Sequence, residues 1–237
     1  MGSFLSAIIG QMDRSTAGSE DTSRRVLKMC GGKKPKNALF FGDDIFTPQL
    51  IEKETGAKVL ATFGEEQRVK SASEAGLEAQ QVGVYELAAN DGGWDLIWYN
   101  GLTEPDGVSR RMEQLRDSLA AGGLAVYRTL CWLIDPSLDT KGFVEHRFGR
   151  PVHLDEVLRL AKEQGLAIED FYIAPRSDWK QSFYEPLSEL VREYEKAREN
   201  TDGDVAAGVG EINREMYMFD LHSEEYSFVY YVLRKKA

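Results

Sequence analysis

The segment 38–63 constrains the fold of this chain more than any other. An apolar run over 38–41 ends at a glycine, a helix predicted over 48–54 begins with proline and ends at a glycine, and a second apolar run covers 59–63. Proline suits the first turn of a helix, and glycine suits the residue just after its end. A strand, a helix and a strand in this order predict a βαβ unit, which binds its ligand at the carboxyl end of the first strand.

The alternation of helices and strands continues after this unit. In chain order, the residue patterns predict a helix over 65–75, a weak strand over 81–85, a strand over 94–99, a helix over 108–119 capped by Gly122 and Gly123, a strand over 124–130, a helix over 153–164, a strand over 167–174 and a last strand over 226–233. Such an alternation implies a mostly parallel sheet with right-handed crossovers. The predicted class is therefore α/β and doubly wound.

The length of 237 residues suits one large domain. We divide residues 1–237 into an N-terminal helical segment (1–30), a core (31–174), an insertion (175–222) and the last strand (223–237). The apolar stretch Phe4–Ile9 predicts a short amphipathic helix that packs on the domain. A long insertion before the last strand is more typical of a functional lid than of a structureless loop, and its most flexible part is predicted at Asn200–Gly210.

Composition excludes several classes of function. A formal charge of −10 and a pI near 5 argue against binding to nucleic acid, which uses Lys and Arg to neutralise phosphates. No apolar run reaches the roughly 20 residues that span a bilayer. The two cysteines and three histidines lack metal-ligand spacing, so no metal site is predicted and a reducing cytoplasm is the expected setting. The N-terminal helix, and the last strand if it stands at a sheet edge, offer surfaces for a homodimer.

An ordered set of motifs runs along nearly the whole chain. It comprises Arg14-Ser15-Thr16-Ala17-Gly18-Ser19-Glu20, Trp94-Asp95-Leu96-Ile97-Trp98, Leu119-Ala120-Ala121-Gly122-Gly123-Leu124, Trp132, the lid residues Pro175, Trp179, Phe183, Tyr184 and Pro186, and Tyr226-Ser227-Phe228-Val229-Tyr230-Tyr231. By this set the chain resembles class I S-adenosylmethionine-dependent methyltransferases, and among them a bacterial group that acts on small molecules. The resemblance implies a Rossmann-like, doubly wound, mostly parallel seven-stranded sheet with an antiparallel last strand and a helical lid inserted before it.

The resemblance also implies S-adenosylmethionine as cofactor and a small molecule as methyl acceptor. The positions that match the cofactor-binding motifs are Gly42, Asp43, Asp44, Phe63, Gly64, Glu65, Gly83, Val84 and Asn100. The positions that match the opening loop, the end of the fifth strand and the lid, and so predict the substrate pocket, are Arg14, Gly18, Trp132, Trp179, Phe183 and Tyr184. No catalytic residue is predicted, because methyl transfer needs mainly in-line positioning of donor and acceptor.

The cofactor motifs depart from the family pattern at several positions. Relatives typically read Leu-Asp-x-Gly-x-Gly-x-Gly where this chain has Leu39-Phe40-Phe41-Gly42-Asp43-Asp44-Ile45-Phe46. Phe46 would fill room left for the methionine part of the cofactor, and Asp44 would place an anion near its carboxylate. Phe63 and Gly83 stand where acidic residues are expected. These departures predict weakened cofactor binding unless Glu65, Glu66 or Asp43 enters the site through a shifted loop.

Each candidate has a structural alternative. Asp43 and Asp44 form either a paired-carboxylate site or a solvated turn that caps the next helix. The four aromatic candidates either line a pocket or pack the lid on the sheet. The opening loop either folds over a ligand or simply caps a helix at Ser19.

Two functions therefore remain open from the sequence. One is methyl transfer to a small acceptor held under the lid. The other is a catalytically inactive binding or regulatory protein that keeps the methyltransferase fold but has lost normal cofactor binding.

Overall fold

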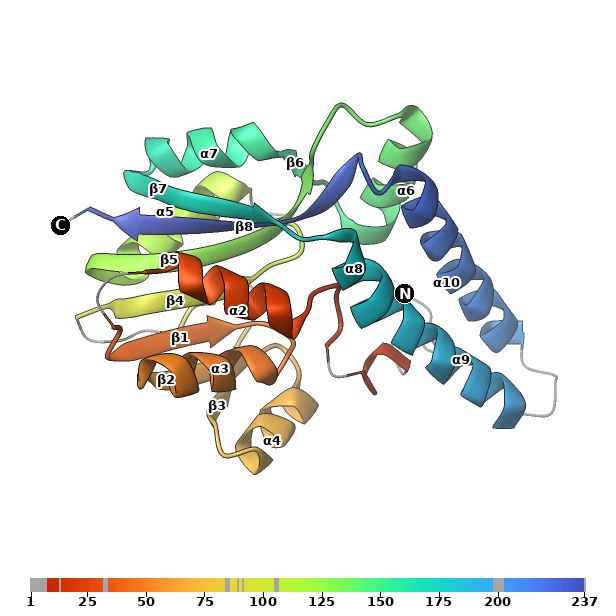
Figure 1. Ribbon diagram of the computed structural model, residues 1–237, viewed down its shortest axis with the longest axis horizontal. Coiled ribbons are helices and arrows are strands. Elements are labelled where there is room, and N and C mark those ends of the chain that lie inside the picture. The colour runs from red at the N-terminus through yellow and green to blue at the C-terminus, as the bar shows by residue number, and fades with distance from the viewer. Residues whose placement is uncertain are drawn as a thin grey trace.

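The computed structural model describes residues 8–12, 14–31, 34–83, 86–88, 90, 92–104, 107–197 and 203–236 (Figure 1). Its strands are β1 (Asn37–Phe41), β2 (Lys58–Phe63), β3 (Glu78–Gln81), β4 (Trp94–Asn100), β5 (Leu119–Trp132), β6 (Val152–His153), β7 (Leu166–Ile173) and β8 (Tyr226–Lys235). Its helices are α2 (Glu20–Met29), α3 (Phe46–Thr55), α4 (Glu66–Glu74), α5 (Val108–Ser118), α6 (Leu138–Phe148), α7 (Leu154–Glu163), α8 (Arg176–Trp179), the π-helix η1 (Lys180–Tyr184), α9 (Glu185–Ala197) and α10 (Gly203–His222).

The strand order confirms the predicted class. Seven strands lie in the order β3-β2-β1-β4-β5-β8-β7, and the two-residue β6 pairs with β5 outside this path. The pairs from β3 to β5 are parallel, whereas β8 is antiparallel to both β5 and β7. Because β8 lies between two neighbours, the condition under which the last strand would offer an edge for a homodimer is not met. The edges belong to β3 and β7.

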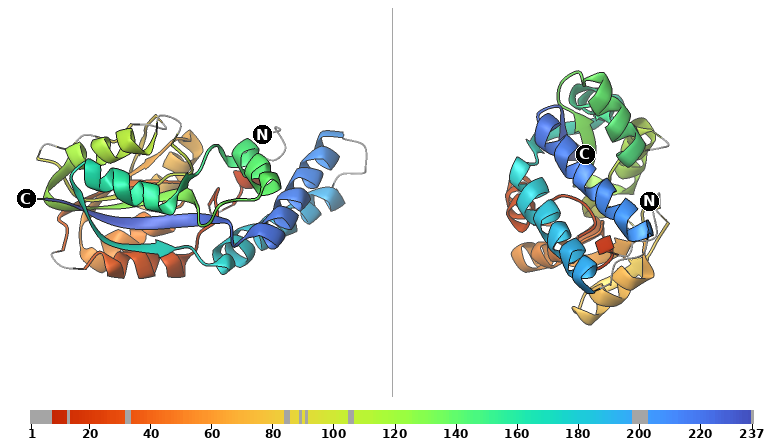
Figure 2. Two further views of the ribbon diagram at one scale, coloured as in Figure 1. Left: turned by 90° about the horizontal axis from the view of Figure 1, so that it is seen from above. Right: turned by 90° about the vertical axis from the view of Figure 1, so that its right-hand side faces the viewer.

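Helices cover both faces of the sheet. Figure 2 shows α2 and α3 on one face and α5 and α7 on the other. Because successive side chains of a strand point to opposite faces, neighbouring aromatic residues are divided between two cores. Tyr99, Tyr127 and Tyr231 are side by side on β4, β5 and β8 beneath α5 and α7. Trp98 and Tyr230 belong to the opposite core.

The third strand corrects the sequence prediction. We expected it over 81–85, but β3 runs over Glu78–Gln81, and residues 84 and 85 lie outside the described part. Helix α4 ends at Glu74, and Gly76 has a φ of 87°, so the chain turns early. Since β3 is an edge strand with largely exposed side chains, it carries no apolar pattern that would reveal it.

The glycines at 122 and 123 do not cap a helix, contrary to expectation. Helix α5 ends at Ser118 and its next residue, Leu119, is already extended. The glycines lie inside β5, opposite a register shift between Trp94 and Leu96 of β4. A Cβ on Gly123 would lie 2.7 Å from the carbonyl oxygen of Trp94, so close approach of the two strands requires glycine there.

Other elements differ in smaller ways. Helix α3 begins at Phe46, two residues before the predicted start, and Gly56 follows its end in the left-handed conformation as expected. Helix α6 was not predicted. Of the stretch Asn200–Gly210, predicted to be flexible, the part from Gly203 onward belongs to α10. The amphipathic helix expected over Phe4–Ile9 lies mostly outside the described residues. The two residues of it that the structure describes, Ile8 and Ile9, are helical and buried.

The lid helices α8, α9 and α10 extend beyond the carboxyl ends of the parallel strands (Figure 1). Aromatic stacking fixes their base. The Trp179 ring is stacked between Phe219 of α10 and Phe228 of β8, with centroid distances of 4.9 and 5.0 Å, and its Nε1 donates to Ser227 Oγ at 3.2 Å. An ion pair between the half-buried Arg147 and the buried Glu215 also joins α6 to α10. The insertion is thus helical, as predicted.

Candidate functional site

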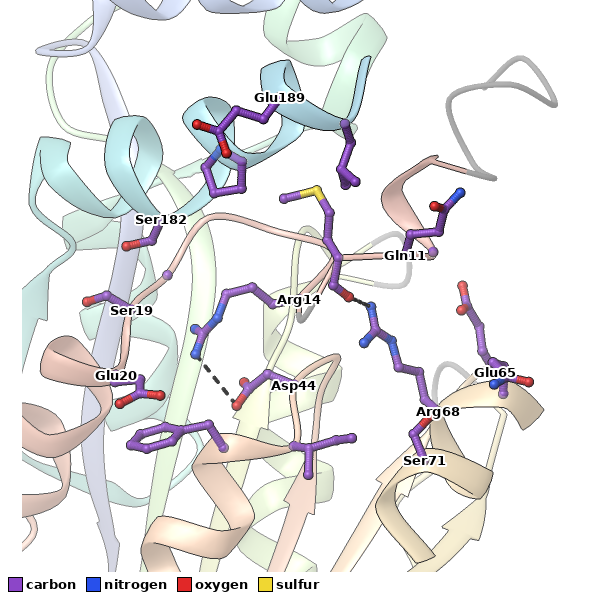
Figure 3. Close-up of a pocket in the computed structure, with 18 of the residues that line it drawn as sticks. Gln11, Arg14, Ser19, Glu20, Asp44, Glu65, Arg68, Ser71, Ser182 and Glu189 are labelled. Atoms are coloured by element: carbon purple, nitrogen blue, oxygen red, sulfur yellow. Dashed lines mark hydrogen bonds and ion pairs between the residues drawn. The ribbon is translucent and has the colours of Figure 1, made fainter. Parts of the chain in front are cut away.

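A cavity of about 940 Å³ opens where the first two parallel strands end (Figure 3). Its walls come from the opening segment (residues 8–12 and 14–19), the loop between β1 and α3, the first turns of α4, and the lid from η1 to α9. Its described lining residues are Gly10, Gln11, Met12, Arg14, Gly18, Ser19, Glu20, Asp44, Ile45, Phe46, Gln49, Glu65, Gln67, Arg68, Ser71, Ser182, Pro186, Glu189, Leu190 and Glu193. Ligand pockets commonly measure about 300–1,000 Å³, so this cavity can hold a nucleoside-sized ligand.

Asp44 lies at the floor of the cavity, where α3 begins. Its Oδ1 accepts a hydrogen bond from the Thr47 amide at 2.7 Å, and its Oδ2 accepts one from Asn100 Nδ2 at 3.4 Å. Only 2% of Asp44 is exposed, so this carboxylate is not solvated as the simpler alternative supposed, whereas Asp43 is half-buried. The capping role is nevertheless real, since a carboxylate satisfies free amides at a helix N-terminus and opposes the positive end of its dipole.

Arg14 of the opening segment points toward Asp44 across the cavity (Figure 3), with Nη2 3.7 Å from Oδ1. Burial lowers the pKa of Arg14, but the negative groups around it, with Asp44 and Asp43 foremost, together outweigh burial and raise the net pKa above its usual value. A Cβ at residue 18 would lie 2.7 Å from Arg14 Nη1, so the glycine there leaves room for the guanidinium group. Arg14 is therefore a fixed cation whose charge is directed at Asp44.

The neighbouring carboxylate, Asp43, anchors the opening segment and does not line the cavity. Its Oδ2 accepts from the Ser15 amide at 2.8 Å and from Thr16 Oγ1 at 3.0 Å. The buried Arg128 of β5 donates to Thr16 Oγ1 and to the carbonyl oxygen of Ala17 at 2.9 and 3.1 Å. Asp43 and Asp44 thus have different roles. Asp43 binds the opening segment, and Asp44 faces the cavity.

The opening segment then leads into α2. Ser19 caps this helix, because its Oγ accepts from the Thr22 amide at 3.1 Å, as one of the sequence alternatives predicted. Burial raises the pKa of Asp178 in α8, while the nearby hydroxyl groups of Ser19 and Thr22 and the positive charges of Arg14 and Arg128 lower it. The start of the lid and the opening segment consequently share one polar network.

Arg68 is a cavity-lining residue that the sequence analysis missed. It lies on α4, is buried, and donates through Nη2 to the carbonyl oxygen of Met12 at 2.7 Å (Figure 3). It holds the part of the opening segment that precedes Arg14. The sequence carried no motif for it, because a lone arginine on a helix is ordinary and its partner is 56 residues away. The cavity residues Gln67, Ser71, Ser182, Glu189 and Glu193 were missed for the same reason.

Four of the predicted site residues line the cavity: Arg14, Gly18, Asp44 and Glu65. The other described ones are outside the lining. Asn100 accepts from Trp98 Nε1 at 2.9 Å while it donates to Asp44, Gly42 follows β1, and Gly64 is exposed after the fully buried Phe63. Gly83 is exposed beyond β3, and Val84 lies outside the described residues.

The aromatic candidates lie in the core. Trp132, Trp179, Phe183 and Tyr184 are each no more than 3% exposed and join the cluster that packs the lid on the sheet. They are not among the described residues that line the cavity. Phe46, by contrast, does line it, while its ring lies 5.1 Å from the guanidinium carbon of Arg24 on α2. A large cavity remains beside Phe46.

The charge of the cavity is strongly biased. Among the described lining residues, five are acidic and two are basic. The acidic ones are Glu20, Asp44, Glu65, Glu189 and Glu193. Both basic residues, Arg14 and Arg68, have partners within the protein. The cavity therefore presents a negative potential to a ligand that enters it.

The described part of the chain lacks two other features, a metal-binding cluster and a membrane-spanning helix. No group of three or more His, Cys, Asp or Glu side chains there could hold a metal ion. No helix in that part is long and apolar enough to cross a membrane.

No protein-family model matches the sequence, and no curated protein matches it. The structure, however, is similar to solved structures over its whole length. It matches an S-adenosylmethionine-dependent methyltransferase from Geobacter sulfurreducens in complex with S-adenosyl-L-homocysteine, with a TM-score of 0.80, 13% identity, and coverage of 100% of this chain and 99% of that chain. An S-adenosylmethionine-dependent methyltransferase from Thiobacillus denitrificans with the same ligand has a TM-score of 0.78, 12% identity, and coverage of 100% and 99%.

A third match is phosphoethanolamine N-methyltransferase 2 of Haemonchus contortus, in complex with phosphomonomethylethanolamine and S-adenosylhomocysteine. Its TM-score is 0.69 with 14% identity, and the match covers 99% of this chain and 57% of that chain. These likenesses establish the fold.

Proposed function

Since this chain has the fold of S-adenosylmethionine-dependent methyltransferases, we propose that it binds an adenosyl cofactor of that type in the 940 Å³ cavity and transfers a methyl group to a small molecule. The observation that carries the proposal is the position of the cavity at the carboxyl ends of β1 and β2. Doubly wound sheets bind nucleotide-type ligands in this place.

Part of the lining suits an adenosyl ligand. Glu65 follows β2 after one intervening residue, lines the cavity and is exposed, so its carboxylate is available to accept hydrogen bonds from ribose hydroxyls (Figure 3). An acidic residue just after the second strand has this role in related dinucleotide sites. The apolar Ile45 and Leu190, also in the lining, provide surface for a base.

The end of the cavity near α3 suits the cofactor less well. Asp44 occupies the N-terminus of α3 and Phe46 narrows the space beside it. The residues present therefore fit the adenosyl part of S-adenosylmethionine and disagree with its amino-acid part.

When bound, S-adenosylmethionine supplies an electrophilic methyl group on a sulfonium centre. The chain's own contribution is to position the donor and the acceptor and to exclude water from the cavity. The lid carries Ser182 and Glu189 over the cavity from the side opposite Asp44 (Figure 3). Five carboxylates in the lining favour a cationic donor over its neutral product, since opposite charges attract more strongly where water is partly excluded. Such positioning is the main requirement of methyl transfer.

The first test blocks the cavity from one helix. Ser71 of α4 lines the cavity, whereas Ser73 on the same helix is exposed and outside the lining. We expect Ser71→Trp to abolish binding of S-adenosylhomocysteine in isothermal titration calorimetry, because the indole occupies the ligand's space. Ser73→Trp should bind as the wild type does, since it adds the same indole to the outer surface.

Turnover is then assayed by mass spectrometry with small amines, thiols and phenols as acceptors. A methylated product that forms with Ser73→Trp and not with Ser71→Trp would support the enzyme. Binding without any turnover would favour the inactive binding protein. If wild type and both variants fail to bind any adenosyl compound at millimolar concentration, the proposed function is wrong.

A further inference from the structure

The disagreement at the α3 end of the cavity has a specific chemical form. In doubly wound folds the helix that follows the first strand directs its N-terminal amides at an anionic group of the ligand. Here the Asp44 carboxylate already accepts the Thr47 amide at 2.7 Å. The anion-binding position at this helix is therefore filled by the protein itself.

The cation that faces this position, Arg14, is likewise paired with a group of the protein itself, Asp44. Arg14 lines the cavity and forms this ion pair with Nη2 3.7 Å from Oδ1. Asn100 Nδ2 completes the set at 3.4 Å from Oδ2. A guanidinium group, a side-chain amide and a helix N-terminus would together bind a free carboxylate well. All three are directed at Asp44.

The rest of the lining does not offer a substitute. Arg68 is bonded to the carbonyl oxygen of Met12, and the other charged lining residues are carboxylates. A second carboxylate brought in by a ligand would lie close to the buried Asp44, where the repulsion of like charges is weakly screened. An ammonium group would meet the opposite situation.

We infer that Asp44 replaces the ligand's carboxylate, so that the cavity selects an adenosyl sulfonium or thioether whose side chain ends in an amine without an α-carboxylate. This inference rests on the proposed function, because it specifies the ligand of the same cavity. It changes the expected donor class from an amino acid derivative to an aminopropyl derivative. Asp44 is the residue that determines this specificity.

Two probes isolate the carboxylate. S-Adenosylhomocysteine and its decarboxylated form, S-adenosyl-3-thiopropylamine, differ only in that group. In isothermal titration of the wild type we expect the decarboxylated compound to bind at least tenfold more tightly, which corresponds to about 1.4 kcal/mol. Equal binding, or tighter binding of S-adenosylhomocysteine, would overturn the inference and leave the proposed function intact.

The Asp44→Asn variant tests the cause. Asparagine is as good a helix cap as aspartate, so the fold should persist, and a thermal melt checks this. We expect the tenfold preference to fall to threefold or less, because the negative charge is gone and Arg14 is free to bind a ligand carboxylate. In the double variant Asp44→Asn, Arg14→Met the gain in S-adenosylhomocysteine binding should disappear.

The matched control is Glu54→Gln. It removes the same charge from the other end of α3, where Glu54 is exposed and does not line the cavity. It should keep the wild-type preference. An equal loss of preference in Glu54→Gln would show a general charge effect and overturn the role of Asp44. Binding of neither probe by the wild type or the Asp44→Asn variant would remove both this inference and the proposed function.

Discussion

The lid and the opening segment both cover the carboxyl end of the sheet, but different forces hold them there. The lid base depends on stacked rings, with Trp179 between Phe219 and Phe228. The opening segment depends on charges and hydrogen bonds, with Asp43 and Arg128 as its anchors. Stacked apolar groups are stable over a wide range of pH and salt, whereas an ionic network responds to the charge of whatever lies beside it.

This difference separates stability from selectivity. The lid base has few polar atoms to exchange with a ligand, so it provides a fixed wall. The opening segment places Arg14 in the cavity. Its ion pair with Asp44 determines which ligand charge the cavity can bind. We therefore expect variants of the lid base to change mainly the free energy of unfolding, and variants of the opening segment to change mainly local opening and binding.

The largest effect is expected from Trp179→Ala. Replacement of a fully buried tryptophan by alanine loses its buried area and leaves a cavity, and typically costs about 3–5 kcal/mol. Trp179 is 1% exposed and also loses its hydrogen bond to Ser227. Urea denaturation should show an unfolding free energy lower by about 4 kcal/mol. The control is Tyr217→Ala on α10, 63% exposed, which should change it by less than about 0.5 kcal/mol.

The next effect is expected from Arg147→Met, which leaves Glu215 buried without its ionic partner. Loss of one partner of a buried pair costs about 3 kcal/mol at pH 7. Burial raises the pKa of Glu215 above its usual value, against the lowering effect of Arg147. A carboxyl group with a raised pKa binds its proton more tightly in the folded state, so the protein gains stability as the pH falls through that pKa.

Without Arg147 the pKa of Glu215 rises further, and the cost of the substitution should be smaller at pH 5 than at pH 7. Urea denaturation of wild type and variant at both pH values measures this. The double variant Arg147→Met, Glu215→Gln should lose the pH dependence. A cost that is the same at both pH values would show that Glu215 is not the titrating group.

Arg128→Met is expected to lower the free energy of unfolding less than the two variants above, but to increase local opening of the opening segment strongly. This variant loses hydrogen bonds to Thr16 and Ala17 and should cost about 2 kcal/mol. Amides of residues 14–19 should exchange hydrogen at least tenfold faster, while those of α10 are unchanged. Arg234→Met is the control, because Arg234 also donates to a carbonyl oxygen, that of Gly122, at the other end of β5. Equal acceleration in both variants would contradict the anchoring role of Arg128.

The smallest effect is expected from Arg159→Ala on α7. Its ion pair with Glu163, at 2.6 Å, is short but exposed. Exposed pairs of this spacing contribute about 0.3–0.5 kcal/mol, because water screens them and ordering two long side chains costs entropy. The urea midpoint should hardly move, and raising the salt concentration should remove the difference that remains. A loss above about 1 kcal/mol would show that exposed ion pairs matter more to this fold than its buried networks suggest.

The sequence by itself determined the order of the main strands and helices. Leu39–Phe41 and Leu96–Tyr99 are apolar runs that no solvent-facing segment would carry, and Gly56 marks a helix end through a local backbone requirement. Such signals depend on neighbouring residues only, so they can be recognised without the fold. The doubly wound sheet followed from them, whereas the helical insertion was implied by the resemblance to methyltransferases.

Only the tertiary structure decided the position of β3, the existence of α6 and the roles of the site residues. The edge strand β3 and the amphipathically weak α6 bury few side chains, so their sequences resemble loops. Arg68 and Arg128 act on backbone atoms 56 and 111 residues away. Asp44 reads as an exposed turn residue until Arg14 and Asn100 are brought beside it. Contacts between distant segments define these roles, because burial and charge pairing depend on the folded neighbourhood rather than on the local sequence.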